Sequence, residues 1–197
     1  MAENACVDFR GWPFLFIHHS RPDLTYTVED GLETLMVDQN PVNKGDEFHF
    51  WQLRQSGLLL VKQILWEDTL ASVNRAPFMV DFDAVATNAG EAVHTLVKLY
   101  EDQLDDDDDV VLRFQLVGVK DRPLSALNPG RLMRGSYICR IPEIAFEVQH
   151  PLADWKAGII DHAVAICQHV LQRFGWDAPG VGECRNVIEK MLQRRLA

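Results

Sequence analysis

The stretch Phe48–Trp66, FHFWQLRQSGLLLVKQILW, constrains the fold most, because it is the densest apolar run in the chain and contains one glycine, Gly57. Residues 46–56 are predicted to form a short helix, whose first residue is a capping aspartate and whose end coincides with that glycine. Residues 58–66 are then predicted to form a strand that is buried on both faces. The same residues also fit a β-hairpin with its turn at Ser56-Gly57, since apolar spacing alone does not separate the two.

The rest of the chain alternates between strand-like and helix-like patterns. Strict alternation predicts a strand at Val110–Val119, where Leu112, Phe114 and Leu116 share one face. Further strands are predicted at Val7–Ile17, Leu24–Glu29, Leu32–Val37, Phe78–Val85 and Tyr137–Val148, with a hairpin turn at Asp30-Gly31. Apolar stripes of helical period predict helices at 89–103, capped by Asn88, at Leu152–Phe174 and at Gly182–Leu196. The fold class is therefore α+β: a mostly antiparallel sheet with helices packed on one face, ending in two antiparallel helices.

Length and composition favour a single domain over residues 1–197. A chain of this size buries roughly 70% of its unfolded surface and needs no disulfide or metal for stability. No run approaches the ~20 apolar residues of a membrane span, and no signal pattern opens the chain, so a cytoplasmic location is expected. The four cysteines form no CxxC pair, which is typical of reduced, packed thiols.

The formal charge of −10 is unevenly distributed. Residues 1–109 hold 21 acidic and 7 basic residues, a balance of −14, whereas residues 110–197 hold 8 acidic and 12 basic residues, a balance of +4. Such an acidic chain repels phosphate at long range, which disfavours non-specific nucleic-acid binding. A local basic surface remains compatible with the second half.

Candidate catalytic and metal-binding residues are scattered. The aspartates Asp105–Asp109 lack the alternating ligands and the mid-loop glycine of an EF-hand, and the seven histidines match no metal signature. Asp8, Asp81 and Asp83 are the carboxylates considered for a hydrolase that would use His and Asp residues. No P-loop or nucleophile elbow occurs. We therefore expect no catalytic residue, no metal and no cofactor.

A basic loop is the strongest candidate for ligand binding. Between residues 110 and 142, one aspartate, Asp121, accompanies a group of Lys and Arg side chains. Guanidinium groups bind phosphates through paired hydrogen bonds, and a tyrosine can stack on a base. The predicted phosphate or nucleic-acid site consists of Lys120, Arg122, Arg131, Arg134, Tyr137 and Arg140. The alternative is a solvated loop that offsets the acidic half.

Three short motifs resemble a known bacterial region. They are Arg10-Gly11-Trp12-Pro13-Phe14, Trp51 followed by Gln55-Ser56-Gly57, and Phe174-Gly175-Trp176. Together they resemble a region that follows a Schlafen-type AlbA_2 domain in bacterial proteins described as DNA-binding or ATP-binding. The AlbA_2 module itself is not visible in these residues, so the resemblance implies a companion module in a nucleic-acid-linked or antiviral defence setting. It transfers no catalytic residue.

These observations predict a non-enzymatic interaction module, acting as a subunit of a bacterial complex or as a homodimer. The expected partner-contacting residues are the aromatic side chains Trp12, Phe14 and Phe16 of the N-terminal strand, or the basic loop. The first alternative is nucleic-acid or nucleotide binding through residues 120–140. The second alternative is the hydrolase. No membrane partner is expected.

Overall fold

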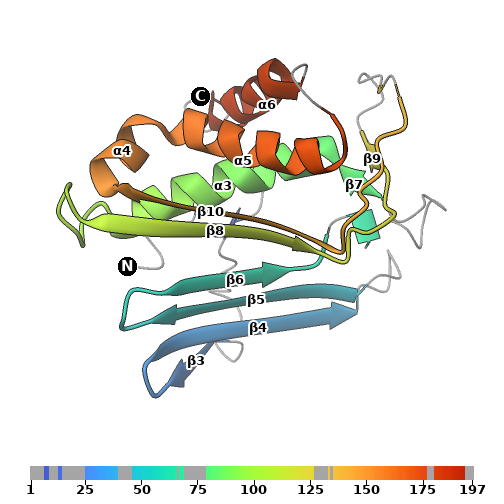
Figure 1. The fold of residues 1–197 in the computed structure, drawn as a ribbon. Coiled ribbons are helices and arrows are strands. Elements are labelled where there is room, and N and C mark those ends of the chain that lie inside the picture. The colour runs from blue at the N-terminus through green and yellow to red at the C-terminus, as the bar shows by residue number, and fades with distance from the viewer. Residues whose placement is uncertain are drawn as a thin grey trace. The chain divides into compact units, whose positions relative to one another are not determined.

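The computed structural model describes residues 7–8, 13–14, 25–39, 46–65, 67–68, 79–126, 133, 135–176 and 180–193. It divides into two compact units, Met1–Phe78 and Met79–Ala197. Each unit has its own secondary structure (Figure 1). The expectation that residues 1–197 form one domain stays a prediction, and an experiment that tests it is given in the Discussion.

The strands described in the first unit are all paired antiparallel. Two short strands, β1 (Val7–Asp8) and β2 (Pro13–Phe14), pair with each other where one interrupted strand was expected. The proline lies at the start of β2, where its missing N–H costs least. The main sheet has the order β3-β4-β5-β6. Its strands are β3 (Thr25–Val28), β4 (Gly31–Gln39), β5 (Asp46–Arg54) and β6 (Leu59–Gln63).

The helix predicted over residues 46–56 is wrong, and the hairpin alternative is confirmed. Residues 46–54 form β5, which pairs with β4 on one side and with β6 on the other. Gly57 adopts a φ of 84° in the connecting turn, where its amide donates to the Arg54 carbonyl at 3.0 Å. The strand after it is not buried on both faces, because no residue of β6 is buried and Lys62 and Gln63 are exposed. The backbone N–H and C=O groups of β5 form hydrogen bonds with β4 on one side and β6 on the other. These hydrogen bonds outweigh the local preference of residues 46–54 for a helix.

The β3–β4 hairpin is confirmed with a turn one residue earlier than predicted. Val28 pairs with Gly31, so the turn residues are Glu29 and Asp30, and Gly31 is the first residue of β4. A Cβ at Gly31 would lie 2.0 Å from the Leu53 carbonyl oxygen of β5. The glycine is therefore needed for a close backbone approach between neighbouring strands.

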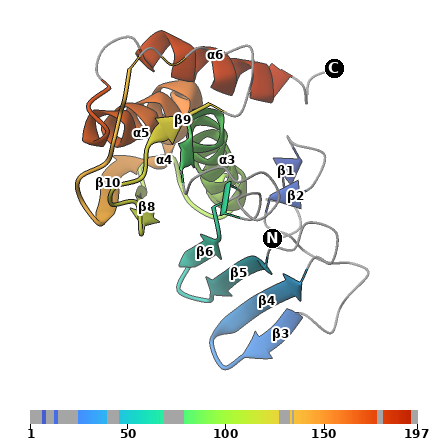
Figure 2. The ribbon, with the colours of Figure 1, turned by 90° about the vertical axis from the view of Figure 1, so that its right-hand side faces the viewer.

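The second unit places helices on one face of a two-stranded ribbon. The strands β8 (Asp109–Val117) and β10 (Glu143–Pro151) pair antiparallel over their whole length. Ile144 and Leu116 point inward from paired positions and are buried. The helices α3 (Phe82–Tyr100) and α5 (Ile159–Arg173) cover this face, and α6 (Gly180–Gln193) lies on them (Figure 2). The alternation predicted at Val110–Val119 is confirmed by β8. The strand predicted at Tyr137–Val148 begins later, at Glu143, and its alternation from Ile144 to Val148 is confirmed by β10.

The helix α3 begins earlier than predicted. Of the described residues 79–85 in the predicted strand 78–85, Val80 and Asp81 form a strand, β7, which pairs in parallel with β9 (Leu124–Ser125). The Asp81 carboxylate caps α3 by accepting a hydrogen bond from the Ala84 amide at 3.1 Å, so Asn88 lies inside the helix. Capping by the earlier residue lets Phe82 and Val85 join the buried stripe.

The predicted helix 152–174 consists of two helices. The short α4 (Leu152–Ala157) ends at Gly158, after which α5 begins. α5 and α6 run in opposite directions and pack against each other, which confirms the antiparallel C-terminal pair (Figure 1). Of the predicted apolar stripe of α6, Cys184, Ile188 and Met191 are buried, while Val187 and Leu192 are partly exposed. Among the described residues, no helix is long and apolar enough to cross a membrane.

Candidate functional site

One face of the four-stranded sheet is apolar and exposed. The side chains of Thr34, Met36, Trp51 and Leu53 are buried on the inner face. On the opposite face, Tyr26 is 49% exposed, Leu35 is 43% exposed and Val37 is 62% exposed. We call this opposite side the outer face; its cross-strand positions are Tyr26, Glu33, Leu35, Val37, Phe48, Phe50, Gln52, Leu60 and Lys62.

Cross-strand pairing makes the apolar part of the outer face continuous. Leu35 of β4 pairs with Phe50 of β5, and the next outward pair is Val37 with Phe48. Both phenylalanines are partly exposed. The solvent-facing side of an antiparallel sheet is usually polar, so two neighbouring apolar pairs are unusual there. Such a patch is typical of a surface that contacts another molecule.

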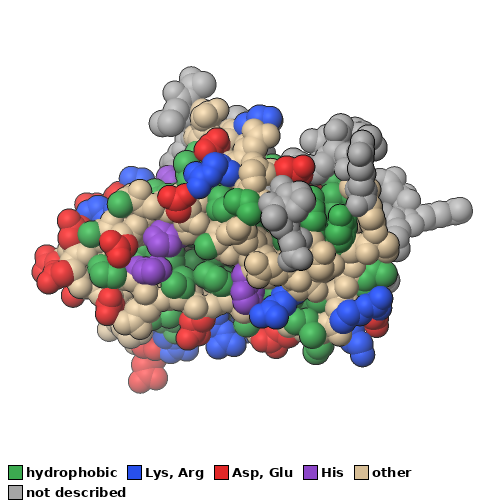
Figure 3. Space-filling view, turned by 45° about the horizontal axis from the view of Figure 1, so that its top comes forward, with side chains coloured by type: hydrophobic (Ala, Val, Ile, Leu, Met, Phe, Trp, Pro, Cys, Tyr) green, Lys and Arg blue, Asp and Glu red, His purple; other side chains and the backbone are tan. Residues whose placement is uncertain are grey.

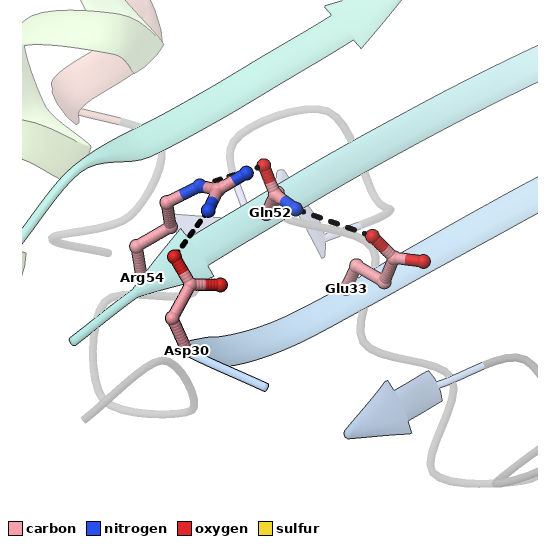
Figure 4. A network of polar contacts seen from close by, with 4 residues as sticks. All are labelled: Asp30, Glu33, Gln52 and Arg54. Atoms are coloured by element: carbon pink, nitrogen blue, oxygen red, sulfur yellow. Dashed lines mark hydrogen bonds and ion pairs between the residues drawn. The ribbon is translucent and has the colours of Figure 1, made fainter. Parts of the chain in front are cut away.

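Polar side chains close one end of the outer face (Figure 4). Arg54 forms an ion pair with Asp30 of the β3–β4 turn. The Arg54 Nε donates to Gln52 Oε1 at 3.2 Å, and Gln52 Nε2 donates to Glu33 Oε2 at 3.2 Å. The network joins the β3–β4 turn, β4 and β5. It orders side chains that would otherwise sample many rotamers. A pre-ordered surface loses less conformational entropy when it binds.

The predicted aromatic interface falls largely outside the described residues. Trp12 and Phe16 lie outside them, and Phe14 is described as part of the β2 backbone. Their proposed role therefore stays a prediction.

The basic loop is an ordered turn where the structure describes it. Asp121 adopts a φ of 62°, and its carboxylate lies 3.6 Å from Arg140 Nη1. The Arg122 Nε donates to the Gly118 carbonyl at 2.8 Å, while Lys120 is exposed. Arg131 and Arg134 lie outside the described residues. The structure thus places Lys120, Arg122 and Arg140 around one turn, with two of the three cations already in polar contacts.

The Tyr137 side chain packs on the protein. Its ring stacks on Trp176 with centroids 5.5 Å apart, and Trp176 in turn contacts Phe82 at 5.2 Å. A Cβ at Gly135 would lie 3.0 Å from the tyrosine ring. These contacts tie the residue to the end of α5 and the start of α3, a structural role that the sequence did not indicate.

A cluster of imidazole and indole rings was not predicted. His150 at the end of β10, Trp155 of α4 and His162 of α5 have ring centroids 4.3–5.4 Å apart. Figure 3 shows histidine side chains gathered among hydrophobic ones on the surface. The two histidines are 12 residues apart across the strand–helix corner, so no spacing rule links them.

Burial lowers the pKa of His162. Desolvation lowers the pKa of His162 below 6.5, His150 adds to the lowering, and the Asp154 carbonyl and nearby acids oppose it. His162 is therefore a neutral imidazole at pH 7. The Trp155 indole is fully buried and donates to the Val110 carbonyl at 3.0 Å.

The acidic candidates have structural contacts. Asp81 caps α3, as described above. The carbonyls of Asp106 and Asp108 accept the Ala153 and Leu152 amides at 2.9 Å each, and so cap the first turn of α4. Within the described part of the chain, no three His, Cys, Asp or Glu residues lie close enough together to hold a metal ion.

Comparisons of the chain with protein-family models, with curated proteins and with solved structures find no match. The resemblance to the region that accompanies AlbA_2 domains therefore stays a prediction.

Proposed function

We propose that this chain is a non-enzymatic interaction module, a cytoplasmic subunit that binds a partner protein through the outer face of its four-stranded sheet. The observation that supports this proposal is the exposure of Leu35 and Val37 beside Phe48 and Phe50. Full burial of one such side chain contributes roughly 1.5–3 kcal/mol and these side chains are already partly buried, so together they supply part of the binding free energy that must offset the cost of association.

Charge favours a basic partner over a second copy of the chain. Residues 1–78 hold 11 acidic and 6 basic residues, a formal charge of −5, and the whole chain carries −10. Two copies would repel each other at long range, whereas a partner with Lys and Arg around an apolar patch would be attracted. The proposed occupant is a protein surface of that chemistry.

The test compares two valines of nearly equal exposure. A photo-crosslinking residue replaces Val37 of the outer face in one variant and Val117 of β8 in the other; these side chains are 62% and 64% exposed. We expect a specific adduct with a basic protein at position 37 and none at position 117. With that protein purified, Val37→Asp should weaken binding at least about tenfold in calorimetry, and Val117→Asp should not.

Other outcomes would overturn the proposal. Equal adducts at both positions, or none at position 37, would show that the outer face is not the binding surface. An adduct between two copies of the chain would favour the homodimer. If single-stranded RNA or DNA binds instead, and Lys120→Ala abolishes the salt-dependent part of that binding, the nucleic-acid alternative replaces the proposal.

A further inference from the structure

The His150–His162 pair carries an inference that is independent of the outer face. The ring centroids of the two imidazoles are 4.8 Å apart, and both side chains are partly exposed. A transition-metal ion binds imidazole nitrogen at about 2.0–2.1 Å, which puts the centroids of two rings in adjacent positions of the same ion about 4.5–5 Å apart when the N–metal–N angle is about 90–100°. The observed separation falls in that range.

The surroundings of His162 prepare one ring nitrogen for coordination. The Nε2 lies 3.2 Å from the Asp154 carbonyl oxygen and donates its hydrogen there, which leaves a lone pair on Nδ1. Metal-binding histidines almost always donate the other ring N–H in this way, which fixes the tautomer and the ring orientation. Gly158 makes room for the ring, because a Cβ there would lie 3.3 Å from His162 Nε2.

We propose that His150 and His162 form a two-imidazole site for a borderline divalent transition-metal ion, Cu²⁺ or Ni²⁺. Imidazole suits both ions, and both accept tetragonal geometry with water in the remaining positions. Water molecules would occupy the remaining coordination positions, because no group of three metal-ligating residues exists in the described ranges. The carboxylate of Asp154 favours a cation beside His162, and Asp161 adds to this effect while it also pairs with Arg185. This proposal departs from the expectation that no metal binds.

The test titrates the full chain, without an affinity tag, with Cu²⁺ alone. A His18→Gln/His19→Gln background removes the adjacent histidine pair of the N-terminal segment. We expect one saturable site by calorimetry and an electron paramagnetic resonance spectrum with coupling to two imidazole nitrogens. His150→Gln and His162→Gln should each lower the affinity at least about tenfold. Gly158→Ala should also weaken binding, because the new methyl group displaces the ring.

The matched control is His169→Gln, on the same helix. The His169 ring packs on Phe146 at 5.3 Å, and this variant should bind Cu²⁺ as the background protein does. Circular dichroism confirms that each variant is folded. A measurement that needs no variant is a nuclear magnetic resonance titration with paramagnetic Ni²⁺. The ion should broaden the ring-proton signals of His150 and His162 before those of the other histidines. Coupling to one nitrogen, an equal loss in His169→Gln, or first broadening at other histidines would overturn the proposal.

Discussion

Gly31 shows how one residue without a side chain sets the approach of two strands. Gly31→Ala would place a Cβ 2.0 Å from the Leu53 carbonyl oxygen, which is backbone and cannot turn away. Overpacking of this kind typically costs about 1–3 kcal/mol. We expect a lower midpoint in urea unfolding, followed by fluorescence in a variant that keeps Trp51 and replaces the other four tryptophans with phenylalanine.

The matched control for this prediction is Gly182→Ala. Gly182 lies in α6, and nothing lies within 4 Å of its Cβ position. Alanine is favoured over glycine in a helix by about 1 kcal/mol, so this variant should keep or raise stability. Equal destabilisation by both substitutions would show that the close approach at Gly31 is not the cause.

The buried thiol of Cys167 predicts a loss of stability in alkali. Its hydrogen bond with Cys184, and then burial, raise the pKa of Cys167 well above its ordinary value of 9.0. The unfolded thiol ionises near 9 while the folded one stays protonated, so this contribution is present below pH 9 and is lost as pH rises above it. The measurement is the melting temperature between pH 8 and pH 10.5.

A variant isolates this effect from other groups that titrate in alkali. In Cys167→Ala, the melting temperature should fall less steeply with pH above 9 than it does in the unchanged chain. Cys139→Ala controls for the removal of a buried thiol as such, since Cys139 is also fully buried. An unchanged slope in Cys167→Ala would contradict the prediction.

At the scale of elements, α6 is held by its apolar stripe. Ile188 is fully buried, and Met191 of the same stripe contacts the Gly90 position of α3 so closely that a Cβ there would lie 2.5 Å from the methionine Cε. Ile188→Ala should destabilise the second unit by about 2–5 kcal/mol, measured by chemical denaturation. Lys190→Ala, an exposed position of the same helix, should change stability by less than about 0.5 kcal/mol. Similar losses in both variants would show that general helix propensity, not packing, holds α6.

At the scale of the whole molecule, the two compact units raise the question of independent folding. The second unit, residues 79–197, has a buried core from its own helices and ribbon, including Phe82, Ile144, Trp155 and Ile166. Because these side chains come from mutually packed elements, we expect the fragment 79–197 to melt cooperatively when it is produced alone. The measurement is calorimetry of the fragment beside the intact chain. An unfolded fragment would instead support one domain over residues 1–197.

Local sequence patterns by themselves determined the main elements of the second unit. The alternation of Leu112, Phe114 and Leu116 predicts a strand with one buried face, and the stripe of α6 predicts a helix; both are confirmed. A side-chain period reports local geometry directly, because one buried face leaves a repeat of 2 in a strand and 3.6 in a helix. The α+β class follows from such repeats.

Tertiary structure alone decided the nature of residues 46–54 and the contents of the candidate sites. Phe48, Phe50 and Leu53 fit either period over so short a run, and the ladders with β4 and β6 selected the strand. The exposure of Val37 depends on which sheet face the core covers, and the meeting of His150 with His162 depends on how α5 folds back from β10. Such contacts join residues distant in sequence, and their free energy comes from three-dimensional packing that no local repeat encodes.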